Sequence, residues 1–366
     1  MTERPFDVVL YGATGFTGRQ TVAYFAAHAP PGLRWAVAGR SADKLAAVAG
    51  GRPVVVADAL DRPAIDALAA QARVVLTTAG PFAQYGDPLV DACVAHHTDY
   101  VDITGETAWV RRVIDRHHAR AAADGTRIVP FCGYDSVPSD LGALMVVEWI
   151  RSSWGQPTVR VLGAFSARGG FNGGTIATVF AQTEAGLAEI ADPVLLCPDL
   201  HRTAAERARN PDRRAVEWSA DLQRWLAPFF MAPTNTRVVR RSAALAHDWD
   251  EGYARPALVP FAYDEALEMR GRLGAWAVLG GTGLAAGMLS TGVGRWLARP
   301  LLPAPGEGPS EAAMNGGFYR TRLVGEAADG RKVLGTFAGE GDPGNRGTVR
   351  MLCEAALLLA TSDRAA

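Results

Sequence analysis

The stretch Gly12-Ala13-Thr14-Gly15-Phe16-Thr17-Gly18 decides the fold of the first part of this chain. It follows a short apolar run typical of a buried strand, Phe6–Tyr11, and it opens a helix predicted over Phe16–His28. At such a junction the first glycine permits a tight turn, the second admits a diphosphate to the backbone amides, and the third lets the helix lie close to the sheet. We therefore predict that a dinucleotide binds at this helix N-terminus, with an ordinary glycine turn as the alternative. The residues expected to hold it are Gly12, Thr14, Gly15, Phe16, Thr17 and Gly18.

The sequence around this turn alternates strand and helix. Through the first 133 residues, short apolar runs alternate with amphipathic stretches, which is the pattern of βαβ units. Runs such as Val54-Val55-Val56 predict strands that helices cover on both faces. The fold class that follows is α/β, with a doubly wound (Rossmann) parallel sheet. The predicted strands are Phe6–Tyr11, Arg34–Ala38, Pro53–Ala57, Arg73–Thr77, Tyr100–Ile103 and Arg127–Phe131, and the predicted helices are Phe16–His28, Ala42–Val48, Pro63–Ala70, Pro88–His96 and Trp109–Ala123.

A second domain of α+β type is expected after the sheet. At 366 residues the chain is long enough for two cores, and its pattern changes after Gly133. We predict a dinucleotide-binding domain over residues 1–135 and a substrate or oligomerisation domain over residues 136–346, with a last helix, Gly347–Thr361, returning to pack on the first. The elements expected in the second domain are a helix Leu141–Ile150, a strand Val159–Ala167, a turn and helix in Gly169–Glu189, a polar helical region Arg202–Trp225, and a hairpin of Phe318–Glu326 and Lys332–Phe337 around Asp329-Gly330.

One segment of the second domain is unusual, because residues 273–294 carry no charged side chain over 22 positions. Its length would span a bilayer, although seven glycines dilute its hydrophobicity. We interpret it as a buried or surface-lying helical hairpin. Peripheral attachment to a membrane, a channel for an apolar substrate and a true membrane span are the alternatives.

Composition excludes several classes of function. The chain has 37 basic and 38 acidic residues, so no net field would recruit nucleic acid. Four scattered cysteines and the lack of a signal-peptide pattern predict a cytoplasmic protein with reduced thiols. The pairs His96-His97 and His117-His118 cannot chelate jointly, because adjacent helical side chains point about 100° apart. No metal is expected.

The end of the second predicted strand indicates which dinucleotide binds. Enzymes that use NAD place an acidic residue there, whereas this chain has Gly39-Arg40-Ser41. The Arg40 guanidinium can hold a 2′-phosphate through charge-assisted bonds, and Ser41 and Lys44 add donors. We therefore predict NADP(H) as the cofactor. The alternative is that Ser41 caps a helix and Arg40 is only solvated.

Two further strand ends are expected to contact the cofactor. Asp58, after the third strand, can accept a hydrogen bond from the adenine amino group or cap the next helix. The turn Thr78, Ala79, Gly80 and Pro81, after the fourth strand, offers a small-residue surface to the nicotinamide half.

Candidate catalytic residues follow the fifth and sixth strands, where ligands bind in such sheets. Hydride transfer needs the nicotinamide pressed on the substrate, water excluded and a proton donor nearby. Tyr134, Asp102 and Glu106 are the candidates in this region. Helix capping or a polar network is the alternative for the two acids, and a structural role is the alternative for Tyr134.

These motifs resemble those of the saccharopine-dehydrogenase-like oxidoreductases, and among them most the actinobacterial trans-acting enoyl reductases and their animal relatives. The resemblance covers nearly the whole chain, with two departures: Tyr134 stands where Phe is expected, and Asn345 where Tyr commonly follows Asp-Pro-Gly. It rests on Tyr11–Gly18, Ala38-Gly39-Arg40, Thr78–Pro81, Tyr100–Glu106, Gly133–Asp140, Gly173-Gly174-Thr175 and Pro305–Ser310.

The resemblance implies an NADPH-dependent reductase that transfers hydride to a C=C bond of an apolar enoyl, polyketide or lipid-like substrate, free or carrier-bound. Reduction of a C=N or C=O bond is the alternative within enzymes. A non-catalytic NADP-binding module associated with a membrane or lipid is the alternative outside them. The sequence leaves open whether the chain forms a homodimer.

Overall fold

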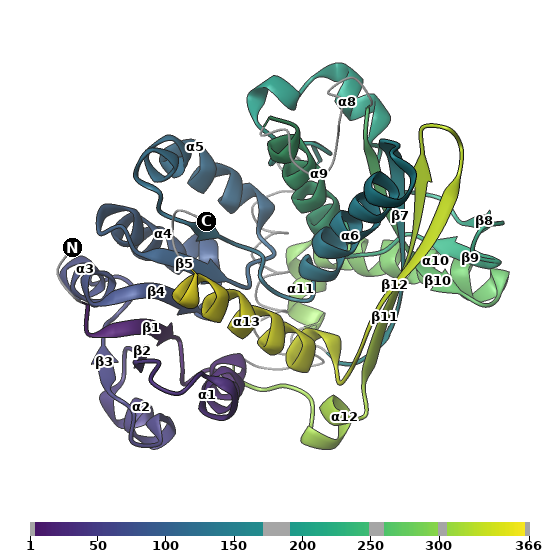
Figure 1. Cartoon of the computed structure of the whole chain (residues 1–366). Coiled ribbons are helices and arrows are strands. Elements are labelled where there is room, and N and C mark those ends of the chain that lie inside the picture. The colour runs from purple at the N-terminus through teal and green to yellow at the C-terminus, as the bar shows by residue number, and fades with distance from the viewer. Residues whose placement is uncertain (1–3, 171–190, 249–259, 299–305, 363–366) are drawn as a thin grey trace.

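The protein contains two six-stranded sheets, joined through a long C-terminal helix (Figure 1). The computed structural model of the chain describes residues 4–170, 191–248, 260–298 and 306–362. The helix predicted within Gly169–Glu189 therefore lies almost entirely outside the described residues.

The first sheet is parallel throughout, with the strand order β3-β2-β1-β4-β5-β6. This confirms the doubly wound fold. Because the order reverses between β1 and β4, the carboxyl ends of these two strands flank the crevice where such sheets bind ligands. The strands are β1 (Phe6–Tyr11), β2 (Trp35–Gly39), β3 (Val54–Val56), β4 (Ala72–Thr77), β5 (Asp99–Asp102) and β6 (Ile128–Val129).

Helices cover both faces of this sheet and bury alternate side chains of its strands. Val8 and Leu10 pack into one core, and Val9 and Tyr11 into the other. The two edge strands depart from the expected burial: in β3 Val54 is 39% exposed and Val56 52%, and in β6 Val129 is 38% exposed. The helices of this domain are α1 (Phe16–His28), α2 (Ala42–Ala49), α3 (Arg62–Gln71), α4 (Phe82–Ala95) and α5 (Thr107–Asp124).

Helix α4 begins at Phe82, six residues before the predicted start at Pro88. The Glu106 carboxylate caps it, accepting hydrogen bonds from the amides of Phe82 and Ala83 at 2.8 Å each. The cap comes from 24 residues away in the sequence, so no local signal marked this start.

Helix α13 (Thr348–Thr361) returns from the second sheet to the first domain. Its side chains Leu352, Cys353 and Ala356 are fully buried against α1 and the strands β1, β4 and β5. Arg127 holds its end by donating to the carbonyl of Leu359 at 2.7 Å. The last helix therefore completes one of the two cores of the first sheet.

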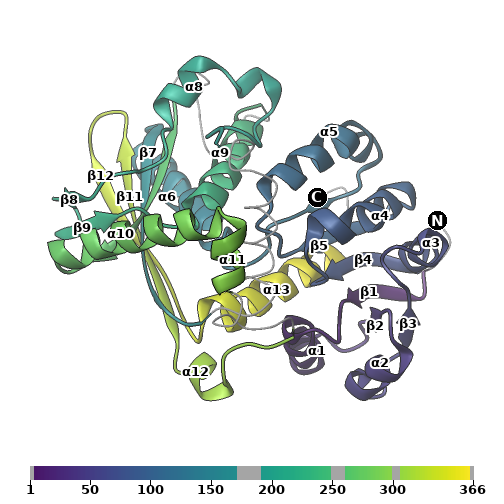
Figure 2. The same ribbon diagram turned by 180° about the vertical axis from the view of Figure 1, so that it is seen from behind.

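The second sheet is mixed, with the order β12-β11-β7-β10-β9-β8. Only β7 and β10 pair in parallel, and the other pairs are antiparallel. Figures 1 and 2 show α6 (Val137–Trp154) and α9 (Ala232–Asp248) on one face. The sheet and its helices confirm the α+β character of this part. The strands are β7 (Thr158–Arg168), β8 (Glu217–Ser219), β9 (Arg224–Ala227), β10 (Ala262–Met269), β11 (Phe318–Ala327) and β12 (Lys332–Glu340).

The polar helical region predicted over Arg202–Trp225 is mostly wrong. Only α8 (Ala204–Arg209) is an α-helix there, and β8 and the start of β9 follow it. Trp218 and Trp225 are directly paired across these two strands, with ring centroids 5.5 Å apart. The cross-strand aromatic pair, rather than a helix face, accounts for their spacing.

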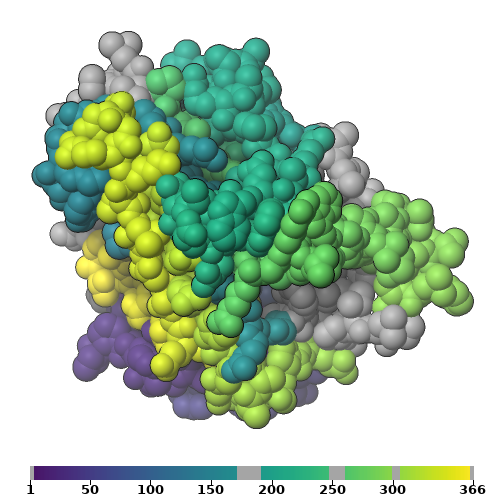
Figure 3. Space-filling model, turned by 90° about the vertical axis from the view of Figure 1, so that its right-hand side faces the viewer, coloured from purple at the N-terminus to yellow at the C-terminus, as the bar shows by residue number. Residues whose placement is uncertain are grey.

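The uncharged segment folds into two helices, α10 (Arg272–Leu289) and α11 (Gly292–Ala298), with 110° between their axes. It is a surface hairpin and not a buried one: Leu273 is 86% exposed, Leu284 77% and Trp296 71%. In Figure 3 the green atoms of this hairpin project beyond the rest of the molecule. Among the described residues no single helix is long and apolar enough to cross a membrane; α10 and α11 meet that criterion only when taken together.

Candidate active site

The glycine turn lies at the crevice between β1 and β4, and two of its glycines are required by close contacts. Gly12 has φ +85°, and a Cβ there would lie 3.0 Å from both the Thr78 hydroxyl and the Ala79 amide. A Cβ on Gly18 would lie 2.1 Å from the Gly12 carbonyl oxygen. The first glycine thus lets the β4 turn approach, and the third lets α1 close on the β1 turn.

The start of α1 offers backbone amides to an anion. No acidic side chain lies in the first turn, and Gly15 at the N-cap position provides no side-chain cap. Among the described residues, the amides of Phe16 and Thr17 find no hydrogen-bond acceptor. A Cβ on Gly15 would meet only the Gly12 carbonyl, at 3.4 Å, so its outer side is open. These features fit a diphosphate at the positive end of the helix.

Arg19 adds a positive charge beside this turn, and the sequence analysis did not identify it. Its guanidinium donates to the carbonyl of Thr14 at 2.8 Å. Nothing in the local sequence distinguishes Arg19, which lies one turn into the helix, from an arginine that is simply exposed to solvent.

The end of β2 lies next to the glycine turn, because the Ala38 carbonyl accepts a hydrogen bond from the Gly12 amide at 2.9 Å. Arg40 and Lys44 are exposed just beyond this point. Ser41 occupies the N-cap position of α2 without making the side-chain cap bond. These three polar side chains therefore remain available at the strand end that neighbours the diphosphate site.

Asp58 lies beyond the end of β3 and forms a local turn, accepting from the Leu60 amide at 3.0 Å. It does not cap α3, because Asp61 does so by accepting from the Ala64 amide at 3.2 Å. Burial, with a smaller contribution from Asp58, raises the pKa of Tyr11 to about 12. Asp58 thus lies beside Tyr11 at the edge of the sheet expected for adenine.

The turn after β4 packs on the glycine turn. Thr78 donates from its hydroxyl to the Gly12 carbonyl at 3.3 Å, and the Ala79 amide donates to the Thr77 hydroxyl at 3.1 Å. The Gly80–Pro81 peptide bond is cis, and Pro81 stands at the N-cap of α4. These contacts bring together the two turns that flank the crevice.

The two candidate acids lie in polar networks that hold the neighbouring turns. Asp102 is fully buried and accepts from the Tyr100 hydroxyl at 2.8 Å and from the amides of Thr104 and Phe131. Burial raises the pKa of Asp102 to about 7 and also raises the pKa of Glu106. The Glu106 carboxylate uses both oxygens to cap α4.

Tyr134 lies where the first sheet, the second sheet and α13 meet. Its ring packs at 5.0 Å from that of Tyr319, in a cluster with Phe165 and Phe229. Its amide donates to the hydroxyl of Thr348, at the start of α13, at 3.2 Å. The Tyr134 hydroxyl makes no hydrogen bond within the described part of the chain, and burial raises its pKa.

Two further carboxyls near Tyr134 were not identified from the sequence. Glu265, on β10, is fully buried and accepts from the Tyr263 hydroxyl at 2.7 Å and the Asn235 amide at 2.9 Å; burial raises its pKa to about 7. Asp135 is half-buried, and desolvation raises its pKa to about 6. The sequence did contain one signal for Glu265: it lies two residues from both Tyr263 and Leu267 and so shares their face of the strand, which puts a charged residue on a core-facing position.

Asn345, the other departure from the family pattern, precedes Thr348, the partner of the Tyr134 amide, by three residues. Its side-chain amide donates to Asp342 at 2.7 Å and to the carbonyl of Gly170 at 3.2 Å. It therefore joins the end of β7 to the segment that leads from β12 into α13. Nearby, a Cβ on Gly308 would lie 2.4 Å from the Phe16 ring, so the second domain also contacts the glycine turn.

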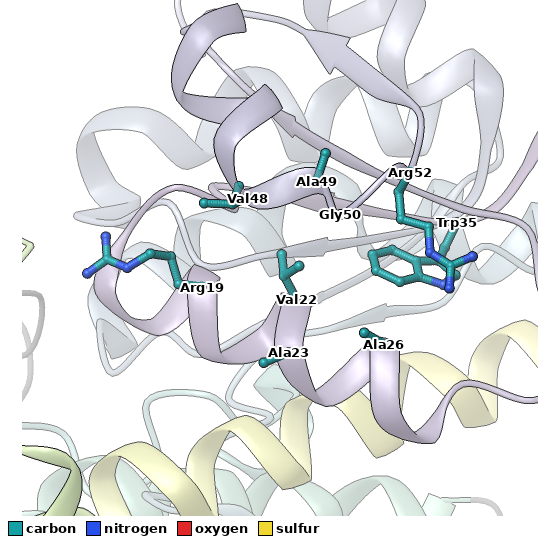
Figure 4. A pocket seen from close by; sticks show the side chains of 9 residues that line it. All are labelled: Arg19, Val22, Ala23, Ala26, Trp35, Val48, Ala49, Gly50 and Arg52. Atoms are coloured by element: carbon teal, nitrogen blue, oxygen red, sulfur yellow. The ribbon is translucent and has the colours of Figure 1, made fainter.

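The groove in Figure 4 runs along α1 from Arg19, beside the glycine turn, toward Trp35 at the start of β2. It measures about 350 Å³ and lies between α1, α2 and the start of β2, with Arg52 stacked over Trp35 at 4.8 Å. Because Trp35 begins β2, the groove reaches the opposite end of the sheet from the crevice, and we assign it no part in the chemistry. Among the described residues, no cluster of three His, Cys, Asp or Glu side chains can hold a metal ion.

A parallel sheet with open amides at its switch point, and basic side chains at the end of β2, defines an NADP-dependent oxidoreductase. The family model of the saccharopine dehydrogenase NADP binding domain matches residues 8–129. A protein of Mycobacterium tuberculosis, whose name assigns it provisionally as a trans-acting enoyl reductase, is 40% identical over 98% of this chain and 90% of its own length. Trans-acting enoyl reductases of Mycobacterium bovis and Mycobacterium ulcerans are 36% identical over the same shares. This chain belongs to the trans-acting enoyl reductase family, and its cofactor is NADP(H).

Solved structures support the fold. The apo saccharopine dehydrogenase (L-Glu forming) from Saccharomyces cerevisiae superposes with a TM-score of 0.50, covering 96% of this chain and 90% of that chain, at 13% identity. At this identity the likeness concerns the fold alone.

Replacing Arg40 with alanine is expected to weaken NADPH binding by about 10- to 100-fold, because charge-assisted bonds to the 2′-phosphate are lost. NADH, which lacks that phosphate, should bind within about twofold of the original affinity. Calorimetric titration of both dinucleotides measures this, with Arg52→Ala as a control outside the crevice. Equal losses for the two dinucleotides would refute the assignment.

The folding stability should depend on the protonation of Glu265. Its raised pKa means that between about pH 4.5 and 7 the folded state keeps a proton that the unfolded chain releases, so stability falls as pH rises through this window. Glu265→Gln has no carboxyl to ionise at this position, so its free energy of unfolding should fall less between pH 5 and pH 8. The difference in the free energy of unfolding between the variant and the original chain should therefore shift in favour of the variant by roughly 1–3 kcal/mol from pH 5 to pH 8.

Urea unfolding at the two pH values measures the difference, with Asp43→Asn, which replaces an exposed carboxylate on α2, as the control. An identical pH dependence for the Glu265→Gln variant and the original chain would mean that Glu265 is ionised in the folded protein.

Proposed function

We propose that this enzyme reduces the C=C bond of an apolar enoyl thioester, small or carrier-bound, at the crevice beside Tyr134. The observation that carries the proposal is Tyr134, which follows β6 of the NADP-binding sheet in the chain and packs in a buried aromatic cluster with Tyr319, Phe165 and Phe229. We infer that the acyl chain packs beside this apolar cluster, which would exclude water from the reacting carbons. The names of the related mycobacterial proteins support the same reaction class.

The cofactor-binding residues are proposed to act as follows. The amides of Phe16 and Thr17, with the turn Gly12, Thr14, Gly15 and Gly18, bind the diphosphate, and Arg40, Ser41 and Lys44 bind the 2′-phosphate. Asp58 accepts from the adenine, and the turn Thr78, Ala79, Gly80 and Pro81 supports the nicotinamide half. When bound, NADPH supplies the hydride for the β-carbon of the enoyl group.

Asp135 is proposed as the acid that protonates the α-carbon. Its side chain is half-buried, follows Tyr134 directly, and has no hydrogen-bond partner among the described residues. Desolvation raises its pKa to about 6, which keeps a proton available near neutral pH. Tyr134 lines the substrate pocket, and Asp102 and Glu106 position the β5 and α4 turns beneath it. The enolate left by hydride addition takes the Asp135 proton at carbon, and solvent returns one to Asp135.

Substitution of Asp135 tests this assignment. Asp135→Asn should lower kcat on an enoyl thioester by about 100-fold or more, because the acid is lost, while leaving the Kd for NADPH within about twofold. In the original enzyme kcat should fall as pH rises through the pKa of Asp135. Tyr134→Phe, which keeps the ring, should retain activity within about threefold.

The reaction class is tested with the same enzyme by following deuteride from labelled NADPH into enoyl thioester, ketone and imine substrates by mass spectrometry. Label at the β-carbon of the thioester supports the proposal. If the enzyme turns over the ketone or the imine but not the enoyl thioester, the result supports the alternative reaction, reduction of a C=O or C=N bond. Tight NADPH binding with no turnover on any substrate points to a binding module.

We also propose that the hairpin α10–α11 rests on a lipid surface. Its outward side chains include Trp276, Trp296 and Leu284, and Arg270 and Arg272 are exposed at its base. A helix with an apolar exposed surface, aromatic anchors and basic flanks is typical of segments that lie at an anionic membrane interface. This position would bring the crevice close to a source of lipid-like substrates.

Vesicle flotation tests the lipid contact. The enzyme should float with vesicles of phosphatidylcholine and phosphatidylglycerol, and Trp276→Ser combined with Trp296→Ser should reduce the bound fraction about fivefold or more, since buried aromatic area is lost. Trp218→Ser, which replaces an exposed tryptophan on β8, is the matched control. Equal flotation of both variants would contradict the assignment.

A further inference from the structure

Strand β12 forms an open edge of the second sheet. Its only hydrogen-bonded neighbour among the described strands is β11. The strand is nine residues long, and between Lys332 and Glu340 it contains neither a charged residue nor a proline. Edges of this length and composition are normally covered, because their free backbone groups and apolar side chains favour association with another chain.

The two ends of this edge carry opposite charges. Lys332, Thr336 and Glu340 lie on the exposed face of β12, together with Leu334, which is 54% exposed. If two copies of the strand pair antiparallel about Thr336, Lys332 of each copy stands opposite Glu340 of the other. Within one chain Lys332 contacts Asp221 at 2.9 Å, but both side chains are more than 40% exposed, so this pair contributes little. The edge is therefore complementary to itself.

Helix α6 carries an exposed apolar stripe along the same edge. The stripe consists of Leu141, Met145 and Trp149, which are 53%, 48% and 44% exposed and recur every four residues on one helix face. Such a face on a helix that packs on a sheet normally marks a contact surface.

The direction of this stripe follows from the neighbours of α6. On one side α6 meets α9, where Asp140 accepts from the Ser242 hydroxyl at 2.9 Å. Trp149 lies about 180° around the helix from Asp140. Beneath the helix, Val146 lies 2.2 Å from the position of a Cβ on Gly325 of β11 and 3.1 Å from one on Gly335 of β12. Since α9 contacts β10, on the opposite side of β7 from β11 and β12, the stripe faces the open edge.

We propose that the chain forms a two-fold homodimer in which β12 pairs antiparallel with β12 of a second copy. The two sheets then form one continuous sheet, and the two α6 helices lie on the same face. With strands about 4.8 Å apart, the helix axes would be separated by about 10–15 Å, a gap that Met145 and Trp149 can fill. Backbone pairing supplies the affinity, while the charges at the strand ends set the register.

The interface lies on the second sheet and does not depend on the reductase assignment. The test therefore measures the mass of the full chain by sedimentation at micromolar concentration, where the original protein should have about twice the chain mass of 38.8 kDa. Lys332→Glu alone should weaken the dimer about tenfold or more, because two like-charged pairs replace two opposite ones, and Glu340→Lys alone should do the same. The double exchange restores opposite pairs and should recover the dimer to within about threefold.

Recovery of the dimer in the double variant would show that the charges set a specific register. The double variant carries both substitutions, so a folding defect caused by either one would persist in it and the dimer would not recover. Met145→Glu on α6 should weaken the dimer independently of the charges. A monomer in the original protein, or a dimer that neither single exchange weakens, would overturn the proposal.

Discussion

The contact between the turns after β1 and β4 is the constraint on which the rest of the crevice depends. Gly12 must lack a side chain because the Thr78 hydroxyl and the Ala79 amide occupy its space. In the part of the chain that the structure describes, the amides of Phe16 and Thr17 at the start of α1 find no acceptor, since the first amides of a helix have no partner within it. Backbone amides without a protein partner are tolerated at a surface, where water or a charged ligand can accept their hydrogen bonds. The turn therefore packs closely against β4 on one side and offers its free amides to a diphosphate on the other.

The fold was largely readable from the sequence, because buried parallel strands and amphipathic helices have distinct periodicities. The strand β1 and the helix α1 have the predicted bounds, and the β11–β12 hairpin turns at Asp329-Gly330, where Gly330 has φ +84°. The start of α4 was not readable, because its cap is Glu106 of another element. Nor were β8 and β9, whose tryptophans pair across strands rather than along a helix.

The candidate site likewise contains residues that the local sequence predicts and residues that only the tertiary structure reveals. Residues of the glycine turn and Arg40 follow strands in sequence, so a local motif predicts them as cofactor-binding residues, and the structure puts them at the carboxyl ends of neighbouring strands. The carboxyls near Tyr134 come from β10 and from the junction before α6, and their protonation depends on burial by distant elements. Desolvation is a tertiary property, and a single charged residue within a short strand gave little sign of it.

Helix α13 carries a consequence for how the molecule is made. The nucleotide-binding sheet is synthesised first, yet one of its two cores contains Leu352, Cys353 and Ala356. On the ribosome, that face of the sheet stays open until more than 200 further residues have been translated, since β6 ends at Val129 and α13 begins at Thr348. The enzyme therefore cannot assemble its cofactor domain in order of synthesis, and the apolar face exposed in the meantime is a natural target for chaperones.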